Sequence, residues 1–210
     1  MQKNKVTLIF FSLLLFGSVV KAQSFEQELK DAVKTSPKFE FRMDSRHSFI
    51  NQKGVKTAGI KVGVQFADKL SFGLGYNQLW SPLQNQIKVN GIETKVSLGF
   101  SNISPYVEYV FFRDNKWELS IPVQLGFGRS FYKNESGFGE KKLRSEFVLS
   151  YEPAITVQYR VFKYFGAGLG IGYRFMVVSN SQLEEKFTSP VYIFKTTIYF
   201  QDILRDLKID

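Results

Sequence analysis

Large apolar side chains alternate with small or polar ones along most of the chain after residue 37. In "WELSIPVQLGFGRSF" (Trp117–Phe131), every second residue is apolar or aromatic except Arg129. A β-strand has a period of two, so this pattern predicts a strand with one apolar face. The alternation recurs in eight segments, which we predict to be strands: 37–50, 55–67, 70–80, 95–112, 116–132, 145–160, 165–178 and 190–201.

The connections between these segments alternate in length. Tight joins contain "ADK" around Asp68, "RDNK" at 113–116 and "VFKY" at 161–164. The other joins are longer and polar, at 81–94, 133–144 and 179–189, and only the join at 51–54 is short. Strands that run up and down place the two sets at opposite ends. The sequence therefore predicts an all-β fold, an eight-stranded antiparallel up-and-down transmembrane β-barrel with a short N-terminal helix.

The apolar face could line a ligand-binding calyx or face lipid, and the opposite face favours lipid. In "FGAGLGIGYRF" that opposite face consists of glycines, which would leave room for large neighbours inside a narrow barrel. Aromatic residues also gather towards both ends of the apolar face, Phe100 and Phe131 among those at the long-loop end. Aliphatic residues such as Ile121 and Val157 lie between them, as in a membrane barrel.

Charged residues share the inner face with the glycines. We expect them to form a closed lumen charge network, because an unpaired buried charge is costly and five acids stand against six bases. The predicted members are Glu40, Arg42, Asp44, Arg46, Lys61, Glu108, Glu118, Glu152, Arg160, Arg174 and Lys195.

The fourth predicted strand contains an irregularity. Its apolar positions switch parity, from Val96, Leu98 and Phe100 to Ile103 and Val107 onwards. Pro105 nearby lacks the amide hydrogen that a sheet ladder requires. We therefore predict a β-bulge near Asn102.

The two ends of the chain carry separate signals. Residues 1–22 combine Lys3 and Lys5, an apolar run and a "VKA" end, which predicts a signal peptide cleaved near Ala22. Residues 23–36 predict a short periplasmic amphipathic helix, 37–201 the outer-membrane barrel, and 202–210 a periplasmic tail that can form a short helix. The sequence has no cysteine, so no disulfide can form.

The net charge of +9 falls to +6 when Lys3, Lys5 and Lys21 leave with the signal peptide. An exported protein rarely meets nucleic acid, so we expect no nucleic-acid partner and favour anionic lipid. Four basic residues that flank the third long loop and two that face outward just below the loops are candidate contacts for the phosphates of lipopolysaccharide. The alternative is a solvated charge run, because Glu135 and Glu140 dilute the patch. The candidates are Lys95, Arg129, Lys133, Lys141, Lys142 and Arg144.

Three stretches together carry a family resemblance: "KAQS", "ISPYVEYVFFRDNKWELSIPVQLGFG" and "YEPAITVQYRVFKYFGAGLGIGYRF". With them the chain resembles small outer-membrane β-barrels of the OmpA-transmembrane or OmpX kind, as found in Bacteroidota-type bacteria. The resemblance implies a cell outer membrane location in a Gram-negative bacterium and folding by the barrel-assembly machinery. Such barrels often end on an aromatic residue, whereas here Phe200 is followed by "QDILRDLKID". The resemblance defines a scaffold and no activity.

Catalysis and metal binding have little support in the sequence. His47 is the only histidine, and its neighbours Asp44 and Ser48 would point to the opposite face of the strand, so no triad can form. We expect no enzyme, cofactor or metal, and a role in envelope structure or surface interaction through the long loops, with an unknown envelope protein as a further partner. The alternatives are a narrow passive channel, a component of a secretion or assembly machine, and a lipid-remodelling barrel enzyme.

Overall fold

The computed structural model describes residues 25–51, 53–81, 83–89, 92–134, 142–183 and 186–207. Residues 25–32 are helical, and a second short helix, α2 (Phe200–Asp206), follows the last strand. Among the described residues, no helix is long and apolar enough to cross a membrane. The strands are β1 (Lys38–Ile50), β2 (Lys53–Phe66), β3 (Leu70–Leu79), β4 (Gln84–Val89), β5 (Ile92–Arg113), β6 (Trp117–Asn134), β7 (Lys142–Phe162), β8 (Phe165–Val178) and β9 (Ser189–Ile198).

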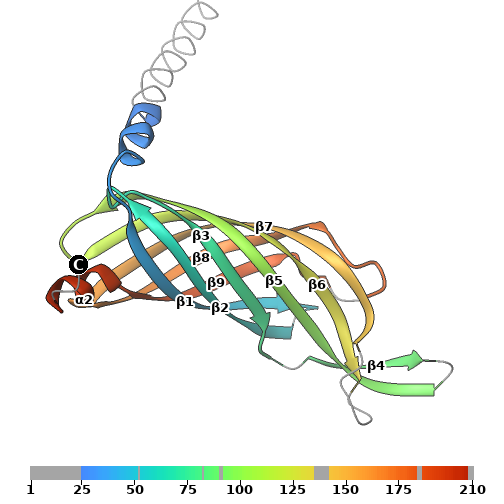
Figure 1. The fold of residues 1–210 in the computed structure, drawn as a ribbon. Helices are drawn as coiled ribbons and strands as arrows, with labels where there is room; N and C mark the ends of the chain where they lie inside the picture. The colour runs from blue at the N-terminus through green and yellow to red at the C-terminus, as the bar shows by residue number, and fades with distance from the viewer. Residues whose placement is uncertain are drawn as a thin grey trace, which may run out of the picture.

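Eight of these strands close into a ring. Each pairs antiparallel with its neighbours, in the order β3-β2-β1-β9-β8-β7-β6-β5, and β5 pairs back onto β3. The ring is the tilted barrel of Figure 1. The predicted eight-stranded up-and-down fold is confirmed, and each predicted segment overlaps one strand of the ring.

β4 is the strand that the sequence analysis missed, because it lies within the join 81–94 that was predicted to be a loop. It pairs with the first residues of β5, from Val89 opposite Ile92 to Gln84 opposite Ser97. This hairpin projects beyond the ring at one end of the barrel (Figure 1). We call that end the loop end, and the opposite end the short-turn end.

The first tight turn, at the short-turn end, shows why these joins are short. Ala67 and Asp68 have φ values of 50° and 57°, and the Lys69 amide donates to the Phe66 carbonyl over 2.9 Å. Positive φ at both central residues is the conformation of a type I′ turn, whose twist matches that of the flanking strands. The neighbouring strands can therefore follow each other directly.

The outer surface of the ring is apolar. Ile60, Ile103, Leu125, Ile155 and Leu169 lie on five different strands and are all exposed. An exposed apolar surface of this extent is rare on a protein surrounded by water, and it is the surface that a membrane barrel presents to hydrocarbon.

The predicted bulge near Asn102 is wrong. Inward-facing residues of β5 keep one parity through Val96, Asn102 and Val110, and the register shift of β5 against β6 lies between Val110 and Phe112. The apolar positions change parity because the interior itself changes. Near the loops the inward-facing residues are apolar, and further down they are polar.

Two aromatic residues expected at the lipid-facing surface are buried. Phe100 is only 2% exposed and belongs to the barrel interior. Phe131 is 5% exposed, and the Lys142 ammonium lies 4.5 Å from the centre of its ring. Alternation gave the wrong side for Phe100 because at that height the apolar residues of β5 point inward, while Ser97, Gly99 and Ser101 point outward.

Both terminal helices lie at the short-turn end (Figure 1). The Phe25 ring meets Tyr109 edge-on at 5.0 Å, and the Phe200 ring meets Phe41 at 6.2 Å. Lys163 and Tyr164 donate hydrogen bonds to Asp206 of α2, and these bonds lower the pKa of that carboxyl. The helix that follows β9 is therefore tied to the turn between β7 and β8.

Candidate functional site: the barrel interior and its loop end

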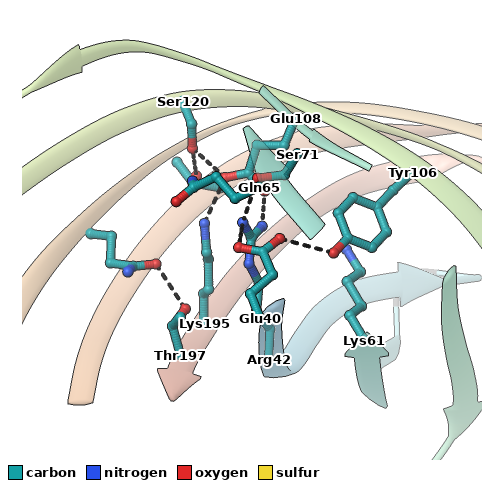
Figure 2. A network of polar contacts seen from close by, with 12 residues as sticks. Glu40, Arg42, Lys61, Gln65, Ser71, Tyr106, Glu108, Ser120, Lys195 and Thr197 are labelled. Carbon is teal, nitrogen blue, oxygen red and sulfur yellow. Dashed lines mark hydrogen bonds and ion pairs between the residues drawn. The ribbon is translucent and has the colours of Figure 1, made fainter. Parts of the chain in front are cut away.

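The charged interior contains two groups of ion pairs. In the first group, Glu108 accepts hydrogen bonds from three side chains: Arg42, Lys195 over 2.6 Å and Ser120 over 2.5 Å. Arg42 also donates to Glu40 over 2.6 Å. Figure 2 shows these side chains converging inside the barrel from β1, β5, β6 and β9. Two acids and two bases balance within this group.

The second group is centred on Arg46, which pairs with Asp44 over 2.6 Å and with Glu152. Lys61 lies 3.2 Å from Asp44, and Arg174 lies 2.8 Å from Glu152. With three bases and two acids, this group carries a formal charge of 3 − 2 = +1. We call the nine residues of both groups the ion-pair network.

The ion-pair network is buried and leaves little space between its side chains. Its ion-paired side chains are at most 8% exposed, the largest value being that of Glu40. The void lined by members of both groups is about 10 Å³, close to the minimum that one water molecule needs. Buried charges of this kind are tolerated because each has a partner at hydrogen-bond distance.

Tyr106 packs against this network, and glycines make room for it. Its hydroxyl donates to Glu40 over 3.1 Å, and the Lys61 ammonium lies 4.9 Å from its ring centre. A Cβ atom at Gly63 or Gly73 would come within 2.7 Å of Tyr106. The inward-facing glycines thus have the predicted spatial role, although sequence reasoning did not identify Tyr106 itself.

Two of the predicted lumen residues lie outside the ion-pair network. Glu118 pairs with Arg113 at the start of the β5–β6 turn, and Arg160 pairs with Asp202 of α2. Arg160 also donates to the Lys163 carbonyl over 2.8 Å, and its side chain is 36% exposed. Parity predicted the direction of these side chains correctly, but it gives no height along the barrel, and both lie at the short-turn rim.

An apolar cluster lies in the interior at the loop end, and this feature was not predicted. It combines inward-facing strand residues with Leu183 and Phe187 from the β8–β9 connection and Ile87 from β4. The Phe187 ring stacks on Phe100 at 5.1 Å, and the Arg174 guanidinium lies 5.7 Å from the Phe100 ring centre. The cluster therefore lies directly above the ion-pair network. Its buried members are Ile50, Val55, Ile87, Val96, Leu98, Phe100, Tyr132, Val148, Leu183 and Phe187.

The basic residues near the third long loop do not form one patch. Lys95 lies on the β5 part of the projecting hairpin, opposite Gln86. Arg129 is exposed on β6, and Arg144 bonds to the Gln182 carbonyl over 3.3 Å. Lys141 lies outside the described residues.

Lys133 and Lys142 are the two basic residues that the structure brings together. They are direct partners in the β6–β7 ladder and line the same groove.

The residues considered for chemistry are placed as follows. His47 is exposed on the outer face of β1, and its ring meets Phe194 edge-on at 5.8 Å. Asp44 and Ser48, its neighbours in the sequence, are buried on the inner face. Within the described ranges, no group of three or more His, Cys, Asp or Glu residues is placed to hold a metal ion.

Comparison with known proteins supports the fold and goes no further. No protein-family model matches the chain, and no curated protein sequence matches it. Among solved structures, Neisserial surface protein A matches with a TM-score of 0.57 at 16% identity, over 77% of this chain and 97% of that one.

Two further solved structures are less similar. Ail, the attachment invasion locus protein of Yersinia pestis, matches with a TM-score of 0.46 at 10% identity, over 77% of this chain and 96% of that one. The N-terminal β-barrel domain of Pseudomonas aeruginosa OprF has a TM-score of 0.44 at 11% identity, over 78% and 98%. The similar structures are small outer-membrane β-barrel proteins.

Proposed function

We propose that this protein is an outer-membrane β-barrel of a Gram-negative bacterium with a closed lumen, acting in envelope structure or surface interaction through its extracellular loops. The apolar belt around the ring supports the membrane location, as does the similarity in fold to Neisserial surface protein A. The signal-peptide pattern of residues 1–22 supports export. In this orientation the loop end faces outward and the terminal helices face the periplasm.

Two layers of buried side chains in the barrel support the proposal of a closed lumen. The ion-pair network fills the middle of the barrel and leaves a void of about 10 Å³ between its members. Above it, the apolar cluster contains Leu183 and Phe187, which come from a loop and not from the wall. A hydrated ion would have to separate paired charges and then cross a dry apolar layer, so conduction is strongly disfavoured.

Planar bilayer recording tests the closed lumen. Purified, folded protein is expected to give no steady single-channel conductance, under conditions in which a general porin conducts. Regular openings from pure protein would overturn the proposal and favour a narrow channel. Fractionation of cells tests the location separately, since recovery of the mature chain in the soluble periplasm would exclude a membrane barrel.

The placement of His47, Asp44 and Ser48 bears on the enzyme alternative. We infer no catalytic role, since His47 lies on the outer face against Phe194 while Asp44 and Ser48 are buried inside. We propose outer-membrane lipid, including lipopolysaccharide, as the main partner, and the barrel-assembly machinery as a partner during biogenesis. The apolar outer surface supports the first partner, and the resemblance to outer-membrane β-barrels supports the second.

A further inference from the structure

A groove opens on the outside of the barrel where the wall between β3 and β5 ends. Pairing of these strands stops at Gln78 opposite Ser101. The chain then turns towards β2, where the amides of Trp80 and Ser81 both donate to the Lys56 carbonyl, over 2.7 and 3.2 Å. The departure of this segment from β5 leaves a groove of about 280 Å³.

Aromatic rings and small residues shape this groove. Gly99 lies on its floor, and a Cβ atom there would come within 2.3 Å of the Phe131 ring, so glycine is needed for that ring to lie over β5. Tyr76 and Trp80 line the groove from the β3 side, and Trp80 is 74% exposed. Ser97 and Ser101 add hydroxyl groups, which bind polyhydroxylated ligands.

Two lysines give the groove a positive edge. Lys133 and Lys142 both line it and stand directly opposite each other across β6 and β7. Two ammonium groups on neighbouring strands can both contact one bound anion, and such charge-assisted contacts are strong. The Lys142 ammonium lies over the Phe131 ring at 4.5 Å, which holds it at the mouth of the groove.

The position of the groove along the barrel axis, next to the apolar outer surface, indicates what kind of anionic ligand fits it. Immediately below it, Leu74 and Ile103 are exposed and belong to the apolar outer surface, whereas Trp80 above them is at the level of aromatic interface residues. A ligand with apolar chains can lie along Leu74 and Ile103 while its polar head enters the groove. The head must carry phosphate for the lysines and hydroxyl groups for the serines.

We propose that this groove binds the phosphorylated sugar headgroup of an outer-leaflet glycolipid. The proposal rests on the outer-membrane location proposed above, and it names the site and chemistry of the lipid contact. The Lys133–Lys142 pair holds the phosphate, Tyr76 and Trp80 flank the sugar, and Gly99 leaves the space that the sugar occupies.

Fluorescence of Trp80 tests the site directly. The sequence has two tryptophans, so a Trp117→Phe background leaves Trp80 as the only reporter. Folded protein in detergent is titrated with bisphosphorylated lipid A, with dephosphorylated lipid A and with phosphatidylglycerol. We expect a saturable change in Trp80 emission with bisphosphorylated lipid A, and affinities about tenfold weaker with the other two probes.

A matched pair of double variants separates the groove from general charge. Lys133→Gln with Lys142→Gln is expected to weaken binding of bisphosphorylated lipid A about tenfold. Lys53→Gln with Lys186→Gln removes the same charge from exposed positions at the same end and should leave the affinity unchanged. Heat-modifiable gel migration shows whether each variant retains the folded barrel.

Three results would overturn the proposal: no saturable change, equal affinity for phosphatidylglycerol, or equal weakening by both double variants. Equal affinity for phosphatidylglycerol would identify a site for any anionic lipid. None of these results affects the closed lumen, which the bilayer recording tests independently. Steady conductance together with selective lipid A binding would overturn the closed lumen and leave the groove intact.

Discussion

Glu108 offers the sharpest test of the ion-pair network, because it holds two cations at once. Its carboxylate pairs with Arg42 and Lys195 and also accepts a hydrogen bond from Ser120. The side chain is 2% exposed. Glu108→Gln keeps the shape of the side chain, removes its charge and replaces one of its two accepting oxygens by an NH2 donor.

The expected cost follows from what the substitution leaves behind. The nine-residue network contains five bases and four acids, so its formal charge rises from +1 to +2. Arg42 retains Glu40, but Lys195 loses the only ion-pair partner shown for it in the described part of the chain. Removing one partner of a buried pair costs about 3–5 kcal/mol, and burial leaves little solvent to screen the surplus charge.

Denaturant unfolding in detergent micelles, followed by tryptophan fluorescence, measures this cost. Glu118→Gln is the control, because its partner Arg113 is 28% exposed at the short-turn rim and can be rehydrated. We expect about 1 kcal/mol for the control. Adding Lys195→Met to Glu108→Gln should recover part of the loss, as coupled neighbours do.

Equal costs for Glu108→Gln and Glu118→Gln would refute this reasoning. A cost of less than about 1 kcal/mol at Glu108 would also refute it, since water must then reach Lys195 inside the barrel. Either result would mean that the ion-pair network is hydrated in solution.

Four further predictions concern other parts of the molecule. Leu125→Arg should destabilise the barrel in lipid by about 2–4 kcal/mol, and Leu125→Met should be nearly neutral in the same unfolding assay; equal effects would mean that Leu125 does not face lipid. Gly73→Val should lower the free energy of unfolding by about 1–3 kcal/mol, because even a Cβ atom there would lie 2.2 Å from the Val62 carbonyl oxygen of β2. A variant as stable as the wild type would contradict this packing. In this cysteine-free chain, Lys53→Cys should react with a membrane-impermeant maleimide on intact cells and Asn115→Cys should not; the reverse labelling would invert the topology. The pKa of Asp206 is lowered by its bonds to the β7–β8 turn, so these bonds stabilise the docked α2 above the unfolded-chain pKa of about 3.9 and are lost as the pH falls below it. Cleavage of the C-terminal segment by an acid protease should therefore accelerate at low pH, and a pH-independent rate would oppose this prediction.

The positions of the strands could be predicted because the alternation of apolar and polar residues decides them. A strand between lipid and a polar lumen must alternate, and the segment predicted at 165–178 coincides with β8, Phe165–Val178. The inward direction of the Glu108 and Arg42 side chains could also be predicted, because charged residues cannot face hydrocarbon in the middle of a membrane. The ion-pair partners of these charges could not be predicted, since the pairing depends on how the strands are staggered around the ring.

The wrong predictions share a different cause: the alternation of apolar and polar residues gives no information on the height of a residue along the barrel. At the height of Phe100 the interior is apolar and the outward-facing residues of β5 are Ser97, Gly99 and Ser101, so the alternating pattern was assigned to the wrong side. Arg160 was assigned to the lumen because its parity is inward, yet it lies at the rim beside Asp202. β4 was missed because "QNQIKV" is short and largely polar, and it becomes a strand only by pairing with the extended β5.

The apolar cluster also limits how the exposed surface can evolve. Leu183 and Phe187 belong to a surface connection, but both are buried in the barrel mouth, at 8% and 4% exposure. Substitutions at exposed positions of this connection leave the core intact, whereas a polar substitution at either of these two positions would disrupt it. Sequence change in this connection is therefore constrained at two positions, and the mouth of the barrel can keep its shape while the exposed residues around it change.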